Sequence, residues 1–122
     1  MQITKVTDTF SVSPQIGYGH VEALAAQGYK AIVNHRPDGE ENGQPLSKAL
    51  AKAAKKAGIA YHYIPFKPGR ATAADKEKFK QILEQTDGPV LGFCRSGMRA
   101  RSLYKACIKG SGGGLLTRLF GR

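Results

Sequence analysis

The chain has 122 residues, of which 41% are hydrophobic and 23% charged, and its formal net charge is +10. This length suits one domain around one core, and the composition is that of an ordinary globular protein. No stretch approaches the about 20 consecutive apolar residues of a membrane span, and Met1–Phe10 lacks the apolar segment of a signal peptide. We therefore expect a cytoplasmic protein with no membrane partner.

Short apolar runs alternate with helical patterns along the chain, which is typical of an α/β domain with a mainly parallel sheet. Turn residues such as Gly28 and Gly58 separate the predicted elements. In chain order the first half holds an opening strand or hairpin (Ile3–Val6 and Phe10–Val12), a helix (Gly19–Gln27), a strand (Tyr29–Asn34), a polar loop (His35–Pro45) and a helix that ends at Gly58, with Pro45 in its first turn.

The second half continues the alternation and ends in a glycine-rich, basic segment. Its predicted elements are a strand (Ile59–Phe66), a helix behind a capping box at Thr72, a strand (Pro89–Phe93) and a helix that carries Leu103, Cys107 and Ile108. We predict a central, mainly parallel sheet with helices on both faces, in which 31–34, 61–64 and 90–93 are adjacent. Residues 1–109 would form the catalytic domain and 110–122 a tail.

The basic excess indicates an anionic partner. However, Lys48, Lys52, Lys55 and Lys56 lie at the spacing of one solvated helix face, and aromatic residues do not alternate with basic ones in a stacking pattern. The sequence therefore favours a small anionic substrate over nucleic acid.

The cysteines and histidines predict neither a disulfide scaffold nor a metal site. Cys94 and Cys107 are too few for a scaffold, and no Cys-x-x-Cys or His-x-x-x-His spacing occurs. We interpret His20, His35 and His62 as structural or surface residues, and we expect no metal and no cofactor.

The segment Cys94–Arg99 follows a predicted strand and precedes a helix. Backbone N–H groups converge in such a loop, the helix N-terminus adds partial positive charge, and Arg99 supplies a two-pronged donor. This field stabilises a thiolate and binds the oxyanion that the thiolate attacks. Cys94 is therefore the predicted nucleophile, and the anion-binding residues are Arg95, Ser96, Gly97, Met98 and Arg99.

Cys107 lies about ten residues into the following helix. At a rise of about 1.5 Å per residue this places it roughly 15 Å from the loop, which is too far for a disulfide with Cys94. We interpret Cys107 as a core residue.

Three motifs resemble those of one bacterial family. They are Phe93–Arg99, Val33–Glu40 (Val-Asn-His-Arg-Pro-Asp-Gly-Glu) and Val12–Ile16 (Val-Ser-Pro-Gln-Ile), and the resemblance runs from about Ile3 to Ile108. Together they resemble the beta-lactamase hydrolase-like protein, phosphatase-like domain family, described both as phosphatase-like and as a rhodanese-like sulfur transferase. The resemblance implies a fold similar to dual-specificity phosphatases.

Loop length separates the two activities that the resemblance implies. Tyrosine-phosphatase loops place five residues between cysteine and arginine, whereas here Ala100 occupies that arginine position and Arg99 comes one residue earlier. Four intervening residues resemble the rhodanese loop, which carries sulfur as a persulfide. A second arginine, Arg101, could reach a phosphate. We keep phosphomonoester hydrolysis through a phosphocysteine as the first hypothesis, sulfur transfer as the second, and a non-catalytic anion-binding module as the third.

A phosphatase also needs a general acid, and the loop Pro65–Arg70 contains no carboxylate. Because the carboxyl ends of parallel strands share one edge of the sheet, the loop after Asn34 should open on the same cleft as Cys94. Asp38 is our first candidate among its acidic residues, ahead of Glu40 and Glu41. Asp75 is explained as a helix-start residue, and Arg36, Lys67 and Arg70 are expected to rim the cleft and attract the anion, with Arg36 among the anion-binding residues.

Overall fold

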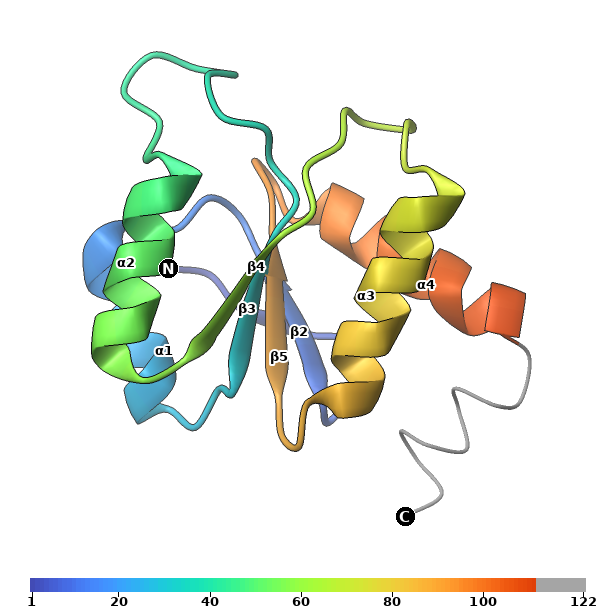
Figure 1. Cartoon of the computed structure of the whole chain (residues 1–122), viewed down its shortest axis with the longest axis horizontal. Helices are drawn as coiled ribbons and strands as arrows, with labels where there is room; N and C mark the ends of the chain where they lie inside the picture. The colour runs from blue at the N-terminus through green and yellow to red at the C-terminus, as the bar shows by residue number, and fades with distance from the viewer. Residues whose placement is uncertain (112–122) are drawn as a thin grey trace.

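The computed structural model describes residues 1–111, with side chains through Ile108. Figure 1 shows a central sheet between two layers of helices. The elements in chain order are β1 (Thr4–Lys5), β2 (Phe10–Ser13), α1 (Tyr18–Ala26), β3 (Ala31–Asn34), α2 (Ser47–Ala57), β4 (Ala60–Tyr63), α3 (Ala73–Gln85), β5 (Val90–Phe93) and α4 (Met98–Ser111).

Within the described residues the sheet has five strands in the order β1-β2-β5-β3-β4. The opening pair β1 and β2 is an antiparallel hairpin, and the remaining pairings are parallel. Strand β3 pairs with β4 on one side and with β5 on the other, so the three predicted neighbours are adjacent. The predicted α/β architecture is confirmed.

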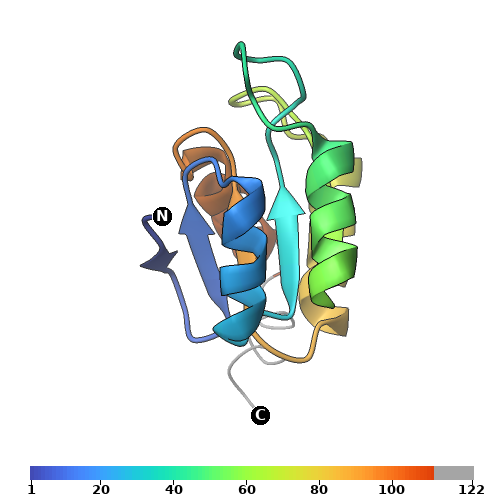
Figure 2. The ribbon, with the colours of Figure 1, turned by 90° about the vertical axis from the view of Figure 1, so that its left-hand side faces the viewer.

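Helices α1 and α2 cover one face of the sheet and α3 and α4 cover the other, as Figures 1 and 2 show. Each face encloses its own apolar cluster. Phe79 and Leu103 belong to the cluster under α3 and α4, whereas Leu24 and Leu50 belong to the one under α1 and α2.

The alternation of side chains along a strand explains why both clusters draw on β5. Val90 faces the first cluster, and Leu91 and Phe93 face the second. All four residues of β5 are buried, as expected for a central parallel strand with helices on both faces. A side chain in place of Gly92 would lie 3.0 Å from the Phe10 ring and 3.1 Å from Ala100, so this glycine lets α4 approach the sheet.

Helix α2 begins differently from the prediction, which placed Pro45 in its first turn. The first helical residue is Ser47 and Leu46 is the N-cap, so Pro45 precedes the helix. Leu46 has no side chain that could accept a hydrogen bond from the first turn. Instead, the Ser47 N–H donates to Asp38 Oδ1 at 2.8 Å. A residue of the preceding loop therefore supplies the cap.

Helix α4 runs through Ser111, two residues past the predicted domain boundary at 109. The rest of the predicted tail lies outside the described residues. Among the helices that the structure describes, none is long and apolar enough to cross a membrane.

His35 lies in the core directly after β3. Its side chain is fully buried, and its Nδ1 is 3.1 Å from the Ile64 carbonyl oxygen. Since a carbonyl only accepts, Nδ1 carries the proton of a neutral imidazole. Desolvation lowers the pKa of His35 from 6.5 to about 4. The expected structural role of this histidine fits these contacts.

His35 should therefore make the protein less stable in mild acid. The unfolded chain takes up a proton at His35 below pH about 6.5, whereas the folded chain does so only near pH 4. Stability is fully present above pH 6.5 and is lost as pH falls through this window, by about 3 kcal/mol. Urea unfolding at pH 7 and pH 4 measures this loss, which His35→Phe should largely remove.

The matched control is His62→Gln, because His62 is only half-buried and burial lowers its pKa as well. The control should keep most of the wild-type loss. An equal loss in wild type and His35→Phe would show that another group causes it.

Candidate active site

The loop that contains Cys94 leaves the sheet between two neighbouring strands. Phe93, the last residue of β5, is paired with Ser13 of β2 and with Asn34 of β3. The chains that follow these strands hold the loop on both sides: the His35 N–H donates to the Phe93 carbonyl at 2.9 Å, and the Gln15 N–H donates to the Arg95 carbonyl at 3.3 Å. The base of the loop is thus fixed by main-chain hydrogen bonds.

Cys94 is fully buried at the base of this loop. Its Sγ accepts a hydrogen bond of 3.0 Å from the Gly97 N–H, directly before the first residue of α4. Gly97 has a φ of +94°, and a Cβ at this position would lie 3.3 Å from backbone atoms of Ser13. The close approach of the Gly97 backbone therefore brings a main-chain donor and a helix N-terminus to the sulfur.

Arg99 lies in the first turn of α4 and is held by a carboxylate from a distant part of the chain. Its Nη1 and Nη2 donate to the two carboxylate oxygens of Glu40, each at 2.9 Å, and Nη1 also donates to the Phe66 carbonyl at 3.2 Å. Such a bidentate pair fixes the plane of the guanidinium as well as its position.

These contacts leave one edge of Arg99 open. A guanidinium has five N–H donors, and Glu40 and Phe66 take both hydrogens of Nη1 and one of Nη2. The remaining two, on Nε and Nη2, point in parallel from the edge that Glu40 does not use. The hydrogen bond with Glu40 raises the pKa of Arg99, and the nearby sulfur of Cys94 adds to that increase. Arg99 can thus offer two parallel donors to an anion at Cys94.

Glu40 also contacts a second arginine. The Arg36 Nε donates to Glu40 Oε1 at 2.9 Å, while its Nη2 donates to Glu41 Oε1 and its Nη1 to Gln15 Oε1, each at 3.0 Å. Hydrogen bonding to Arg99 and then to Arg36 keeps the pKa of Glu40 below its usual value, and Arg36 does the same for Glu41. Both carboxylates are therefore ionised at neutral pH.

Arg36 is predicted to lie at the rim of the cleft, but the structure buries it. Only 2% of the residue is exposed, and each nitrogen of its guanidinium donates to a side chain of this cluster. Burying a charged group requires such partners, and the acidic pair in its own loop provides them. Its predicted contact with a bound anion stays a prediction.

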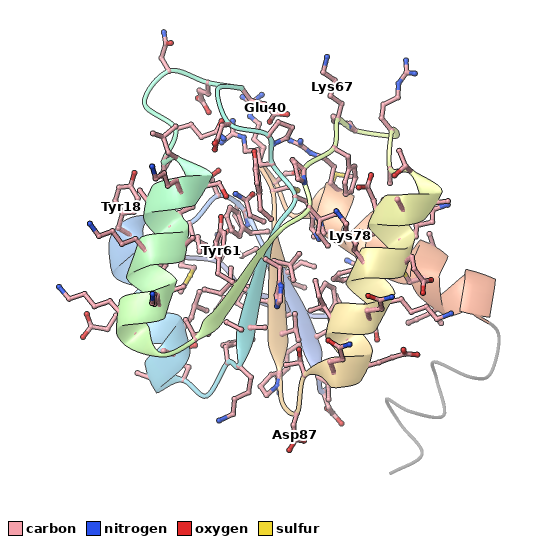
Figure 3. All side chains as sticks on the ribbon, in the orientation of Figure 1. Tyr18, Glu40, Tyr61, Lys67, Lys78 and Asp87 are labelled. Carbon is pink, nitrogen blue, oxygen red and sulfur yellow. The ribbon has the colours of Figure 1, made fainter. Side chains whose placement is uncertain are left out.

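Asp38 is placed beside α2. Its carboxylate accepts from the Ser47 N–H, and its own N–H donates to the Tyr63 hydroxyl at 2.9 Å. These contacts give it a structural role at the start of the helix, and its role as a proton donor stays a prediction. Glu40 and Lys67 lie on separate loops beyond the carboxyl edge of the sheet, and Lys67 points away from it (Figure 3).

The remaining predicted site residues surround the outer side of the loop. Arg95, Ser96 and Met98 are exposed, as is Arg101 in the first turn of α4. Ser96 Oγ accepts a weak hydrogen bond of 3.4 Å from the Met98 N–H. Lys67 and Arg70, which are expected at the rim of the cleft, are exposed in the loop after β4.

Two further residues have the structural roles that the sequence indicates. The Asp75 carboxylate accepts from the Thr72 N–H at 2.8 Å and its N–H donates to Thr72 Oγ1, which completes the capping box of α3. Cys107 is buried, and burial raises its pKa to about 11. Neither cysteine forms a disulfide.

The sequence favours Asp38 in the loop after Asn34 and does not indicate that Glu40 is the partner of Arg99. Glu40 and Arg99 are 59 positions apart in the sequence, so no local spacing pattern connects them. Glu40 comes four residues after Arg36, and this spacing indicates only the ion pair between these two residues. Within the described residues, no group of three or more His, Cys, Asp or Glu side chains is arranged for a metal ion.

A comparison with protein families identifies the domain. The model of the family described as beta-lactamase hydrolase-like protein, phosphatase-like domain, matches residues 2–110. The chain belongs to this family. Beta-lactamase hydrolase-like proteins of Xylella fastidiosa and Agrobacterium fabrum are each 38% identical over 104 residues, which is 85% of this chain. The chain spans about a quarter, 24%, of the length of these curated relatives.

Solved structures agree with the family. A candidate phosphatase from Neisseria meningitidis is 30% identical, with a TM-score of 0.81 over 98% of this chain and 87% of the other. Tk-PTP in its active form has a TM-score of 0.72 over 96% of this chain and 79% of its own, at 18% identity, and so shows the fold alone. The family description is that of a phosphatase-like domain, and these solved structures share its fold.

Proposed function

We propose that this domain hydrolyses phosphate monoesters through a phosphocysteine at Cys94. The open edge of Arg99 carries the proposal, because Glu40 and Phe66 do not use its Nε–H and one Nη2–H and the guanidinium interacts with the Cys94 sulfur. The loop N–H groups and the first turn of α4 add positive potential at the same place. We propose that the reaction takes place in the cytoplasm.

In the first step the Cys94 thiolate attacks phosphorus, so that an S–P bond forms and the ester P–O bond breaks. Asp38 is the proposed donor of a proton to the leaving oxygen, because arginines hold Glu40 and Glu41 in the ionised form. In the second step water gives a proton to the Asp38 carboxylate and attacks phosphorus, so that a P–O bond forms, the S–P bond breaks, phosphate leaves and the Cys94 thiolate is restored. Arg99 and the loop N–H groups bind the oxygens of phosphorus throughout.

Sulfur transfer is the second candidate, and the length of the loop favours it. Four residues separate Cys94 from Arg99, and this tighter loop resembles that of rhodaneses. In this reaction the Cys94 thiolate attacks the outer sulfur of thiosulfate, so that an S–S bond forms, sulfite leaves and Cys94 carries a persulfide. A module that binds anions without any covalent step is the third candidate.

Intact mass spectrometry after rapid acid quench distinguishes the three candidates. Incubation with an aryl phosphate should add the mass of one phosphoryl group to the wild-type chain and nothing to Cys94→Ser. One added sulfur atom after thiosulfate, with no phosphoryl adduct, would replace hydrolysis by sulfur transfer. No adduct from either compound, with retained affinity for phosphate, would leave only the binding module.

A further inference from the structure

A cavity of about 550 Å³ opens beside the Cys94 loop. Its walls come from the loop after β4, from the start of α3, and from the Cys94 loop with the adjoining turns of α4. This volume lies within the range of about 300–1,000 Å³ that small organic ligands occupy. The cavity is therefore large enough for a ring or a short alkyl chain.

The lining of the cavity is mainly apolar. Its apolar side chains are Phe66, Pro68, Ala71, Met98, Leu103 and Ala106. Phe66 and Leu103 are core residues that face it, whereas Met98 is 72% exposed. Methionine adapts its shape to irregular apolar ligands. Burying an apolar group among these side chains is favourable.

The cavity adjoins the proposed anion site. Arg95, Ser96 and Arg99 line it as well, so the Cys94 loop forms one of its walls. Phe66 contacts both the anion site and the cavity, because its carbonyl accepts a hydrogen bond from Arg99 Nη1 and the residue also lines the cavity. A phosphate held by the open edge of Arg99 would thus have its ester group next to apolar side chains.

We propose that this cavity binds the organic group of the substrate, and that the substrates are phosphate monoesters of apolar alcohols or phenols. The proposal rests on the proposed anion site at Cys94 and Arg99 and specifies the class of substrate. Under this proposal Ser102 and Ala106, on the outer face of α4, contact the organic group and help to select the substrate.

Calorimetric titration of the full chain carrying Cys94→Ser tests the proposal without any turnover. The probes are inorganic phosphate and the methyl, propyl, butyl and hexyl monoesters of phosphate. Affinity should rise about fourfold for each buried methylene until the cavity is filled. A second substitution in the same chain, Ala106→Phe, fills the cavity and should abolish the dependence of affinity on chain length. Ser102→Phe, at an exposed position of the lining, should weaken this dependence.

The matched control is Lys105→Phe, which places the same ring on an exposed position of α4 that does not line the cavity. It should keep the chain-length dependence. Equal affinity for methyl and hexyl phosphate, while inorganic phosphate still binds, would overturn the cavity proposal and leave the anion site intact. Absence of phosphate binding would overturn the anion site and the proposed function with it. Chain-length dependence combined with an inactive wild type would support the cavity and reject hydrolysis.

Discussion

Replacing Arg99 with lysine should lower kcat/KM for an aryl phosphate by about 10²–10³-fold, although the charge is kept. Lysine cannot form the bidentate contact with Glu40 and cannot offer two parallel donors to the anion. Steady-state kinetics at neutral pH measures the effect. Glu40→Gln should lower activity less than Arg99→Lys, because it keeps Arg99 and loses only the charge that orients it.

Arg101→Lys is the control for this prediction. Arg101 is exposed in the same helical turn, so its substitution should change activity only slightly. Loss of activity in Arg101→Ala together with normal activity in Arg99→Ala would mean that Arg101, and not Arg99, binds the anion.

Substituting Cys94 with serine should lower turnover by roughly 10⁶-fold, the size of effect that removal of a nucleophile has in a serine protease. Affinity for phosphate should persist, because Arg99 and the loop N–H groups remain. Kinetics and phosphate titration of the same preparation measure the two effects. Cys107→Ala is the control and should keep its activity, because Cys107 belongs to the core under α3 and α4.

Labelling with iodoacetamide at pH 6 should separate the same two cysteines. Burial raises the pKa of Cys107 to about 11, so its thiol stays protonated at this pH, whereas the Cys94 sulfur faces the Gly97 N–H and the start of α4. Peptide mapping should find the label on Cys94, and phosphate should slow its appearance. Equal labelling of both cysteines would contradict an activated thiolate.

The sheet and the position of the loop could be predicted because local patterns specify them. Buried runs such as Val90–Phe93 reveal central strands, and the parallel arrangement brings their carboxyl ends to one edge. Cys94 and Arg99 follow directly from the strand and helix that flank them. The capping box at Thr72 and Asp75 is likewise local, since each residue serves the other within one turn.

The partners of Arg99 could not be predicted in this way. Glu40 reaches it from the loop between β3 and α2, and only the folded chain brings that loop to α4. Asp38 and Glu40 lie in the same loop and are both acidic, so the residue types alone do not distinguish their structural roles. Asp38 caps α2, while Glu40 lies between two arginines.

The bridging position of Glu40 means that ionic strength should affect two parts of the site differently. The distances from Glu40 to Arg36 and Arg99 are 2.9 Å, far shorter than the screening length of about 8 Å at physiological salt. The side chains of Arg36 and Arg99 are only 3% and 9% exposed, and buried pairs are screened much less than exposed ones, so the guanidinium of Arg99 keeps its orientation as salt is added. The exposed charges of Lys67, Arg70 and Arg95 act on an approaching anion across open solvent, where added salt weakens their attraction. Salt thus controls how fast an anion arrives, while the geometry that receives it stays the same.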